Sequence, residues 1–382
     1  MRHPIPLRPS GGDPLAAPGE LRIEPLQGWS LPLLNDAAFA DLQPLLQRSL
    51  LLRQPERLLS ALVQRPPLVP EVLVAYEAAD CMLGLSVVRR LNRSGSCWGV
   101  EALRVARAAL QRPGGRSGQE IQAGLLREAL HRCSGAASWM ARCDSTDIDR
   151  LALLREQGFQ PLRHEVAWLW NAPAEPGPAL PPPGDLQLRP LNRRTAGLLL
   201  HLEQAACPAL LRQLLDRRVE DLLDQSSGAS ALWLDPSRQQ AVAGVRRLHH
   251  QGHGPVDVQL TVHPGWSRLH GPALEHLLIQ AVASDPVVRL CSDAGDAERC
   301  AWLRSIGASP EGEQLLMARS VWRRHEQASS RAANWRLDTV LEPFKPRRRT
   351  VPTPAGPSAL TPATRPARAL VSASTSALST VR

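Results

Sequence analysis

One pattern of apolar and polar positions occurs twice along the chain. Residues 147–158 read D-I-D-R-L-A-L-L-R-E-Q-G and residues 296–307 read D-A-E-R-C-A-W-L-R-S-I-G, so the second copy starts 149 positions after the first. Apolar residues recurring three and four positions apart predict an amphipathic helix in each copy. The acidic residues at its start suit the positive end of a helix dipole, and Gly158 and Gly307 stand where a left-handed helix end favours glycine.

The elements around this helix recur in the same order. We expect helices over residues 119–133 and 272–284, each preceded by a glycine-containing loop. Before these loops, residues 100–105 and 258–262 are typical of strands. Each block then reads as helix, strand meander, loop, helix, strand, helix and hairpin. That order predicts an α/β (α+β layered) fold in each block, with a central mixed sheet flanked by helices.

Composition marks where these blocks begin and end. Residues 172–184 are dominated by Pro, Ala and Gly, which favour an extended linker. The first twenty residues are Pro- and Gly-rich, and the chain after about residue 344 has too few large apolar side chains to offset the entropy of ordering. We therefore expect a disordered N-terminus at 1–20, a first domain at 21–171, a linker at 172–184, a second domain at 185–325 and a basic, largely disordered tail at 326–382.

The net charge of +9 would suit a nucleic-acid partner, but it is concentrated in the tail. Seven basic residues and no acidic residue follow position 343, so the two blocks are nearly neutral and show no obvious basic face. The sequence has no apolar run near the length that a membrane helix needs, about 18 residues, and its N-terminus lacks the apolar core of a secretory signal. We expect neither a nucleic-acid nor a membrane partner.

The seven cysteines are scattered and form no C-x-x-C pair, so neither a disulfide framework nor a zinc ribbon is expected. His249, His250 and His253 could ligate zinc, but their glycine-rich surroundings favour a hairpin turn. We therefore expect no metal, and a reducing cytoplasm as the compartment. The oligomeric state is left open.

The order of elements, found twice, resembles the GNAT acyltransferase superfamily. In that superfamily a fourth strand ending in V-x-P is followed by Q/R-x-x-G-x-G/A, which opens a helix. In the second block, V-H-P at 262–264 is similar to the strand exit, and R-L-H-G-P-A at 268–273 fits the loop. In the first block, residues 112–117 follow the loop pattern except at the last position. The resemblance implies two tandem modules, of which one or both can be degenerate.

The resemblance also implies acetyl-CoA, or another acyl-CoA, as co-substrate and an amine as acceptor. Amides at a helix N-terminus bind anions, so the loop before the helix would hold the pyrophosphate. We expect tighter binding in the second block, because its connection from strand to helix is shorter and fewer residues must be ordered. The residues expected at the cofactor are Leu260, Thr261, Val262, Arg268, Leu269, His270, Gly271 and Ala273 in the second block, and Leu103, Val105, Arg112, Gly115 and Ser117 in the first.

Acyl transfer to an amine needs a base that removes the amine proton, and Glu101, Asp257 and His263 are the candidates. The sequence departs from the superfamily where a tyrosine usually protonates the departing thiolate, because Leu154 and Leu303 stand there. The retained loop favours an N-acyltransferase. The missing tyrosines favour a non-catalytic tandem protein that binds a CoA ligand or a protein partner, and both hypotheses stay open here.

Overall fold

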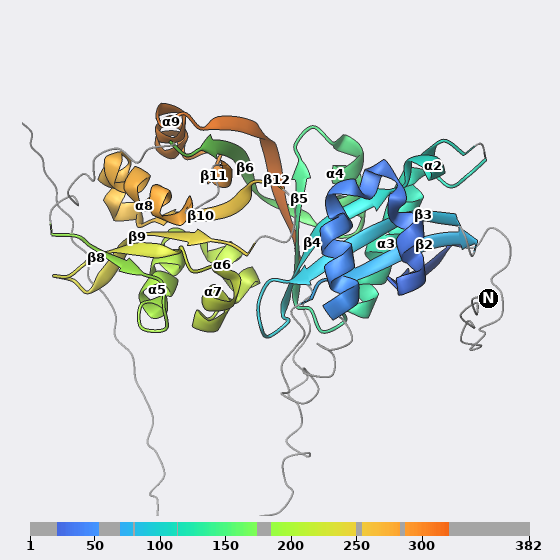
Figure 1. The fold of residues 1–382 in the computed structure, drawn as a ribbon, viewed down its shortest axis with the longest axis horizontal. Coiled ribbons are helices and arrows are strands. Elements are labelled where there is room, and N and C mark those ends of the chain that lie inside the picture. Colours follow the sequence, from blue (N-terminus) through green and yellow to red (C-terminus); the bar gives the residue numbers. More distant parts are fainter. Residues whose placement is uncertain are drawn as a thin grey trace, which may run out of the picture. The chain divides into compact units, whose positions relative to one another are not determined.

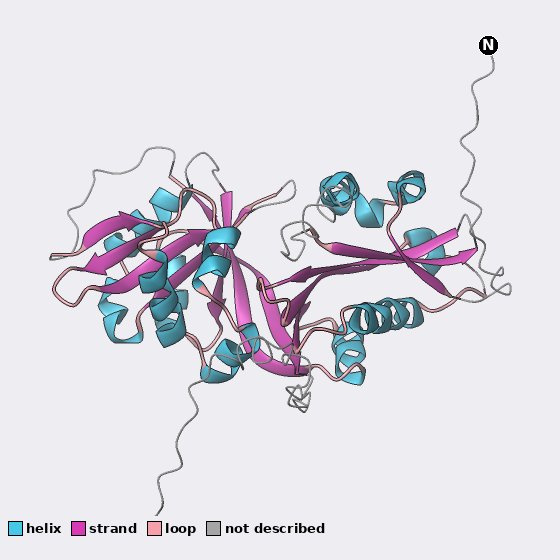
Figure 2. Ribbon diagram, turned by 90° about the horizontal axis from the view of Figure 1, so that it is seen from below, coloured by secondary structure: helices cyan, strands magenta, loops and turns pink. Residues whose placement is uncertain are grey.

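A computed structural model describes residues 21–52, 69–78, 81–112, 114–173, 185–249, 254–282 and 287–320. These residues form a mixed sheet with helices packed against it (Figure 1). The view coloured by secondary structure shows the strands as a layer with helices on its faces (Figure 2). The N-terminal segment, most of the linker, His250, His253 and the tail lie outside the described residues. The domain boundaries placed there stay predictions.

The first module, within residues 21–173, contains the predicted meander of strands, the loop, two helices and a strand between them. Its elements in chain order are β1 (Arg22–Pro25), η1 (Gly28–Asn35), η2 (Ala37–Leu42), β2 (Glu71–Ala78), β3 (Cys81–Arg90), β4 (Cys97–Val105), α2 (Arg107–Leu110), α3 (Gly118–Arg132), β5 (Ser138–Asp144), α4 (Ile148–Glu156) and β6 (Gln160–Asn171).

The second module, within residues 185–320, repeats this order. The layered fold expected from the sequence is therefore confirmed in both blocks. Its elements are β7 (Gln187–Pro190), α5 (Ala196–Ala206), α6 (Ala209–Leu215), α7 (Val219–Gln225), β8 (Ala231–Asp235), β9 (Gln240–Arg247), β10 (Val256–Val262), η3 (Pro264–Leu269), α8 (Pro272–Val282), β11 (Val287–Asp293), α9 (Ala297–Ser305) and β12 (Ser309–Ser320).

The two modules exchange their last strands. Strand β12 of the second module lies between β5 and β6 of the first, and β6 lies between β11 and β12 (Figure 1). The predicted hairpin at the end of each block is therefore wrong. Each block ends in one strand of 12 residues, which is long enough to pair along its length with strands of the other module. A sequence pattern identifies a strand but not its partner.

The exchanged strands pair symmetrically. Ser309 lies opposite Leu169, and Ala318 lies opposite Gln160. Ser309 and Ala318 are the counterparts of Gln160 and Leu169 under the 149-residue offset, so the two pairs are equivalent. Glu165 and Gln314 face each other at the centre of this arrangement. Helix α6 of the second module packs its leucines against β5 and β12. The two modules therefore share a single sheet and part of their cores.

The repeated helix begins and ends in the same way in both copies. Asp147 accepts a hydrogen bond from the Arg150 amide, and Asp296 accepts one from the Arg299 amide, each at 3.0 Å. Gly158 and Gly307 close the helices with φ of +84° and +83°, where a side chain would be strained. Strand β6 begins at Gln160, shortly after Gly158, and β12 begins at Ser309, shortly after Gly307. The helix prediction and its glycine end are confirmed.

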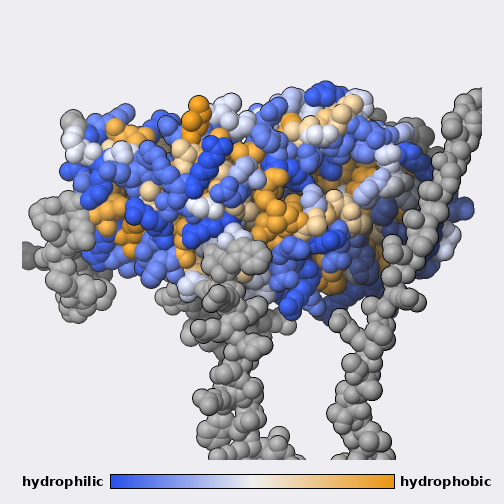
Figure 3. Space-filling model, turned by 180° about the vertical axis from the view of Figure 1, so that it is seen from behind, coloured by the Kyte–Doolittle hydropathy of each residue, from blue (hydrophilic) through white to orange (hydrophobic). Residues whose placement is uncertain are grey.

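Polar side chains cover most of the face seen in Figure 3, with apolar side chains in smaller groups between them. This mixture is ordinary for a surface exposed to water. Within the described ranges, no helix is long and apolar enough to cross a membrane.

Glu165 is a buried carboxylate at the centre of the shared sheet. It is fully buried and accepts hydrogen bonds from Arg142 at 2.8 Å and from Arg163 at 3.1 Å. Burial alone would raise the pKa of Glu165, but the charges and hydrogen bonds of the two arginines outweigh it and lower that pKa. The folded state therefore binds this proton less readily than the unfolded chain does.

We expect Glu165→Gln to lower the free energy of unfolding by about 1.5–3 kcal/mol at pH 7, the contribution of a charged hydrogen bond. Because the folded pKa is the lower one, this stabilisation is present above the pKa of the unfolded chain and is lost as pH falls through the folded pKa. Urea unfolding of wild type and variant at pH 7 and near pH 3 measures the difference. A difference that is equally large at both pH values would contradict the assignment. Glu128→Gln, in a surface pair with Arg132, is the control and should change little.

Candidate functional site

Strands β4 and β5 part within the first module. They run parallel in register from Cys97 opposite Ser138 to Val100 opposite Ala141. Beyond that point β4 pairs with β3, and β5 pairs with β12. The facing edges in this gap therefore carry backbone groups that form no hydrogen bonds from strand to strand, an arrangement that can accept an extended ligand. The predicted cofactor residues Leu103 and Val105 lie on β4 beside this gap.

The second module has the equivalent gap. Strands β10 and β11 are in register from Val256 opposite Val288 to Val258 opposite Leu290, and then part. The predicted cofactor residues Leu260, Thr261 and Val262 follow on β10, where they pair with β9 on the other side. In both modules, therefore, the predicted cofactor residues on the strand lie where its edge is open.

An arginine reaches into each gap from the helix that follows. Arg150 of α4 donates to the Leu103 carbonyl oxygen at 3.3 Å, and Arg299 of α9 donates to the Leu260 carbonyl oxygen at 2.8 Å. Burial lowers the pKa of both arginines. Neither arginine was expected at a site from the sequence, although both copies of the repeat have arginine three positions after the capping aspartate.

The loop of the second module leaves two amides free at the start of α8. The amides of Leu274 and Glu275 bond to the Gly271 carbonyl, and Pro272 has no N–H. The amides of Gly271 and Ala273 donate no hydrogen bond to the part of the chain that the structure describes. Gly271 has φ of +152°, a conformation that favours glycine. This helix start has the free donors that an anion needs.

The other predicted residues of this loop have different environments. The Arg268 guanidinium stacks over the Trp266 ring at 4.5 Å from its centre. His270 contacts the Ser267 carbonyl oxygen through Nδ1 at 2.7 Å. Leu269 is 3% exposed and packs in the core of the module, so it anchors the loop to the core and is not exposed to a ligand.

The equivalent loop of the first module is engaged internally. Ser117 and Glu120 form a reciprocal capping box, in which each side chain bonds the other residue's amide. The Glu120 carboxylate also places a negative charge where a phosphate would bind. Arg112 pairs with Glu77 at 2.6 Å. The predicted residue Gly115 closes a turn back to the Arg112 carbonyl. The first loop is therefore less suited to an anion than the second.

The candidate bases fall into two groups. Glu101 is the extra residue of a bulge in β4, opposite the step from Val87 to Val88, a device that redirects a side chain. It pairs with Arg89 at 2.6 Å. Burial raises the pKa of Glu101, Arg89 opposes this, and the charge of Asp257 adds to it. Asp257 belongs to the other module, so the fold brings these two predicted bases into one electrostatic environment.

His263 has a local structural role. It caps η3, and its Nδ1 accepts a hydrogen bond from the Gly265 amide at 3.1 Å. One ring nitrogen is therefore engaged in holding the loop. Within the described ranges, no group of three His, Cys, Asp or Glu side chains is arranged to hold a metal ion.

Leucines occupy the positions on α4 and α9 where the superfamily usually has a tyrosine. Leu154 and Leu303 are 1% and 0% exposed, in the cores of their modules. Tyr76, the one tyrosine of the chain, lies on β2 and bonds the Ser30 hydroxyl at 2.7 Å. A thiolate leaving either gap would receive its proton from water or another group.

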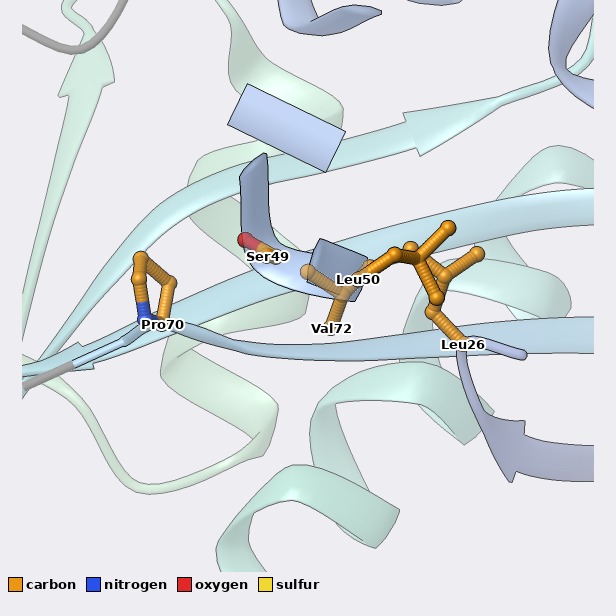
Figure 4. A pocket seen from close by; sticks show the side chains of 5 residues that line it. All are labelled: Leu26, Ser49, Leu50, Pro70 and Val72. Atoms are coloured by element: carbon orange, nitrogen blue, oxygen red, sulfur yellow. The ribbon is translucent and has the colours of Figure 1, made fainter. Parts of the chain in front are cut away.

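A pocket lies beside β2, away from the two gaps in sequence (Figure 4). Its lining has one hydroxyl and no ionisable side chain, so it provides neither a base nor an anion site. The lining residues are Leu26, Ser49, Leu50, Pro70 and Val72.

Known proteins resemble the chain in structure. No protein-family model matches it, and no curated protein does. A GCN5-related glucosamine N-acetyltransferase region of a fungal multi-domain β-N-acetylglucosaminidase is 11% identical with a TM-score of 0.50, over 81% of this chain and 39% of that one. A tandem GNAT protein from the clavulanic acid biosynthesis pathway is 16% identical with a TM-score of 0.49, over 79% and 98%.

A GCN5-related N-acetyltransferase from Sphaerobacter thermophilus is 14% identical with a TM-score of 0.45, over 65% of this chain and 80% of that one. At such identities the similarity concerns the fold. Both modules contribute to the match with the fungal structure, because the 81% of this chain that it covers is longer than either module. The described residues therefore adopt the GNAT fold twice in tandem, with a central mixed sheet flanked by helices.

Proposed function

We propose that the chain is an N-acyltransferase that uses acetyl-CoA or another acyl-CoA, held by the second module, and an amine acceptor. One observation carries this proposal: the free amides of Gly271 and Ala273 stand at the start of α8, and η3 joins them to the open end of β10. A single ligand with a pyrophosphate and an amide-containing arm would use both features. The superfamily fold supports the same activity.

The residues of the second module fit such a ligand. The amides of Gly271 and Ala273 would bind the pyrophosphate, and Arg268 has no carboxylate partner among the described residues, so its charge is available to a phosphate. The open edge of β10, at the Leu260 amide and at Val262, would bond the pantetheine arm, while the Leu260 carbonyl oxygen is bonded by Arg299. Bound acyl-CoA supplies the thioester whose acyl carbon the amine nitrogen attacks as the thiolate departs.

The protein would hold the substrates, stabilise the charge that develops during the reaction and move the protons. Backbone amides of Leu260–Val262 would stabilise the negative charge that develops on the thioester oxygen. Glu101 or Asp257 would take the proton of the amine. The raised pKa of Glu101 brings this carboxyl closer to the neutral range in which a general base works best. The free thiols of all seven cysteines support a cytoplasmic location for this activity.

A second candidate function is a non-catalytic tandem protein that binds a CoA ligand or a protein partner. The buried leucines at the tyrosine position, Leu154 and Leu303, favour it. Release of free thiol from acetyl-CoA in the presence of mixed amines distinguishes the two functions. Binding without turnover supports the second one.

We expect Arg268→Ala to weaken acetyl-CoA binding by about 1.5–3 kcal/mol, the value of a hydrogen bond to a charged group. Gly271→Val should abolish measurable binding, because the added side chain blocks the approach of the pyrophosphate to the helix start. Isothermal titration calorimetry with acetyl-CoA measures both effects.

Two matched variants separate binding from folding. Gly254 has φ of +154° and open space around it, so Gly254→Val introduces similar backbone strain away from α8. Arg112→Ala removes the equivalent arginine of the first module, which is paired with Glu77. Both should bind acetyl-CoA as wild type does. Loss of binding in Arg112→Ala alone would move the site to the first module, and a wild type that binds no CoA compound would refute the proposed function.

A further inference from the structure

Arg299 brings a positive charge to the gap between β10 and β11 and forms no ion pair with a carboxylate among the described residues. Its Nη2 donates to the Leu260 carbonyl oxygen at 2.8 Å, and its Nε is buried without a hydrogen-bond partner in the described residues. Asp296, which precedes α9 and whose charge acts on Arg299, uses its side chain to cap the helix at the Arg299 amide. The guanidinium therefore has an unused, buried Nε donor beside the Leu260 edge of the gap.

Such an arrangement costs stability, because a buried charge without an opposite charge loses its hydration. Burial indeed lowers the pKa of Arg299. The first module repeats the arrangement, since Arg150 bonds Leu103 and also has a buried Nε without a partner. Neighbouring positions differ between the two helices: Leu153 in one corresponds to Trp302 in the other. Both modules therefore have a buried arginine without an ion pair among the described residues, although the residues around it differ. An arrangement that lowers stability and is present in both modules indicates a ligand that supplies the missing negative charge.

We infer that Arg299 binds a carboxylate at the end of the acyl group, so that the second module takes acyl-CoAs of dicarboxylic acids. This inference rests on the proposed function and names its substrate class. A guanidinium donates through a planar fork that matches a carboxylate. The phosphates of CoA have their own donors at Gly271 and Ala273, outside the gap. With the pantetheine arm along the open edge of β10, the acyl end would lie farther into the gap, toward the point where β10 and β11 pair and beside the Leu260 carbonyl that Arg299 contacts.

The experiment is calorimetry on the full chain with succinyl-CoA and butyryl-CoA, whose acyl groups have the same number of carbons and differ in the terminal carboxylate. Free CoA and free succinate are further probes, which separate recognition of the phosphates and of a free acid from recognition of the acyl carboxylate. We expect succinyl-CoA to bind about tenfold or more tightly than butyryl-CoA, the factor given by one charged hydrogen bond.

Arg299→Gln keeps a donor for the Leu260 carbonyl and removes the charge, so it should reduce succinyl-CoA affinity to that of butyryl-CoA. Arg299→Lys keeps the charge and should retain part of the preference. Arg150→Gln changes the equivalent residue of the first module and should leave the preference intact. Melting temperatures without ligand show whether each variant is folded.

The possible results separate the two proposals. Equal binding of succinyl-CoA and butyryl-CoA to wild type overturns the inference and leaves the proposed function standing. No binding of any CoA compound overturns both. Succinate that binds as tightly as succinyl-CoA, or a preference that survives in a folded Arg299→Gln, overturns the role of Arg299. A preference lost in Arg150→Gln alone overturns its assignment to the second module.

Discussion

A chain that ends at Ala308 should fold in neither half. The truncation removes β12, which lies between β5 and β6 and pairs with both. Three large side chains of this strand, Leu315, Leu316 and Met317, are at most 5% exposed, and each contributes about 1.5–3 kcal/mol by burial. Together with two lost strand ladders, the loss is comparable to the whole stability of a typical domain, about 5–15 kcal/mol.

Circular dichroism and thermal melting of the purified chain measure this result. A cooperative melting transition for the first module in the truncated chain would show that its sheet is complete without β12. A chain that ends at Pro343 is the matched control. It keeps β12 and removes the part of the tail that carries the seven basic residues after position 343, so its melting temperature should stay close to that of the full chain.

Glu203→Ala should lower the free energy of unfolding by about 3–5 kcal/mol, the cost of breaking a buried ion pair from one side. Glu203 on α5 accepts from Arg246 on β9 at 2.7 Å, and the Arg246 side chain is 1% exposed. Burial lowers the pKa of Arg246, and Glu203 opposes that shift. Without Glu203, the arginine keeps neutral acceptors such as Gln259 and loses its counter-charge. Urea unfolding gives the difference.

Two variants test whether the effect comes from burial of the pair. Glu311→Ala removes one partner of a surface pair in which Arg289 and Glu311 are 35% and 40% exposed, and it should cost less than about 1 kcal/mol. Glu203→Leu combined with Arg246→Met removes the most deeply buried charge together with its partner and should recover part of the loss. Arg217, which is 21% exposed and also pairs with Glu203, keeps the recovery incomplete. Equal losses in Glu203→Ala and Glu311→Ala would refute the explanation.

Local patterns predicted the elements of the fold well. The helix expected at 119–133 is α3, Gly118–Arg132, and the helix expected at 272–284 contains α8, Pro272–Val282. Helix periodicity and glycine ends depend on neighbours in sequence, so a single sequence contains them. The exchange of β6 and β12 could not be predicted in this way. Which strand fills a position in a sheet depends on contacts between residues far apart in the chain.

The candidate site shows the same division. The loop at 268–273 could be located from its motif, and its place before α8 is as expected. The sequence S-x-x-E at 117–120 is a capping-box signal, and it accounts for the reciprocal hydrogen bonds of Ser117 and Glu120 in the first loop. The contact of Arg299 with Leu260 requires the separation of β10 from β11, which only the three-dimensional structure gives. The roles of the predicted site residues stay predictions.

The strand exchange has a consequence for how the protein is made. Strand β5 ends at Asp144, and its neighbour β12 begins only at Ser309. A ribosome adds about 5–20 residues per second, so the gap between these strands corresponds to roughly ten seconds or more of synthesis. Until then the nascent first module has an open sheet edge that can pair with other chains. Slow translation of the second module therefore prolongs the period in which newly made chains can aggregate.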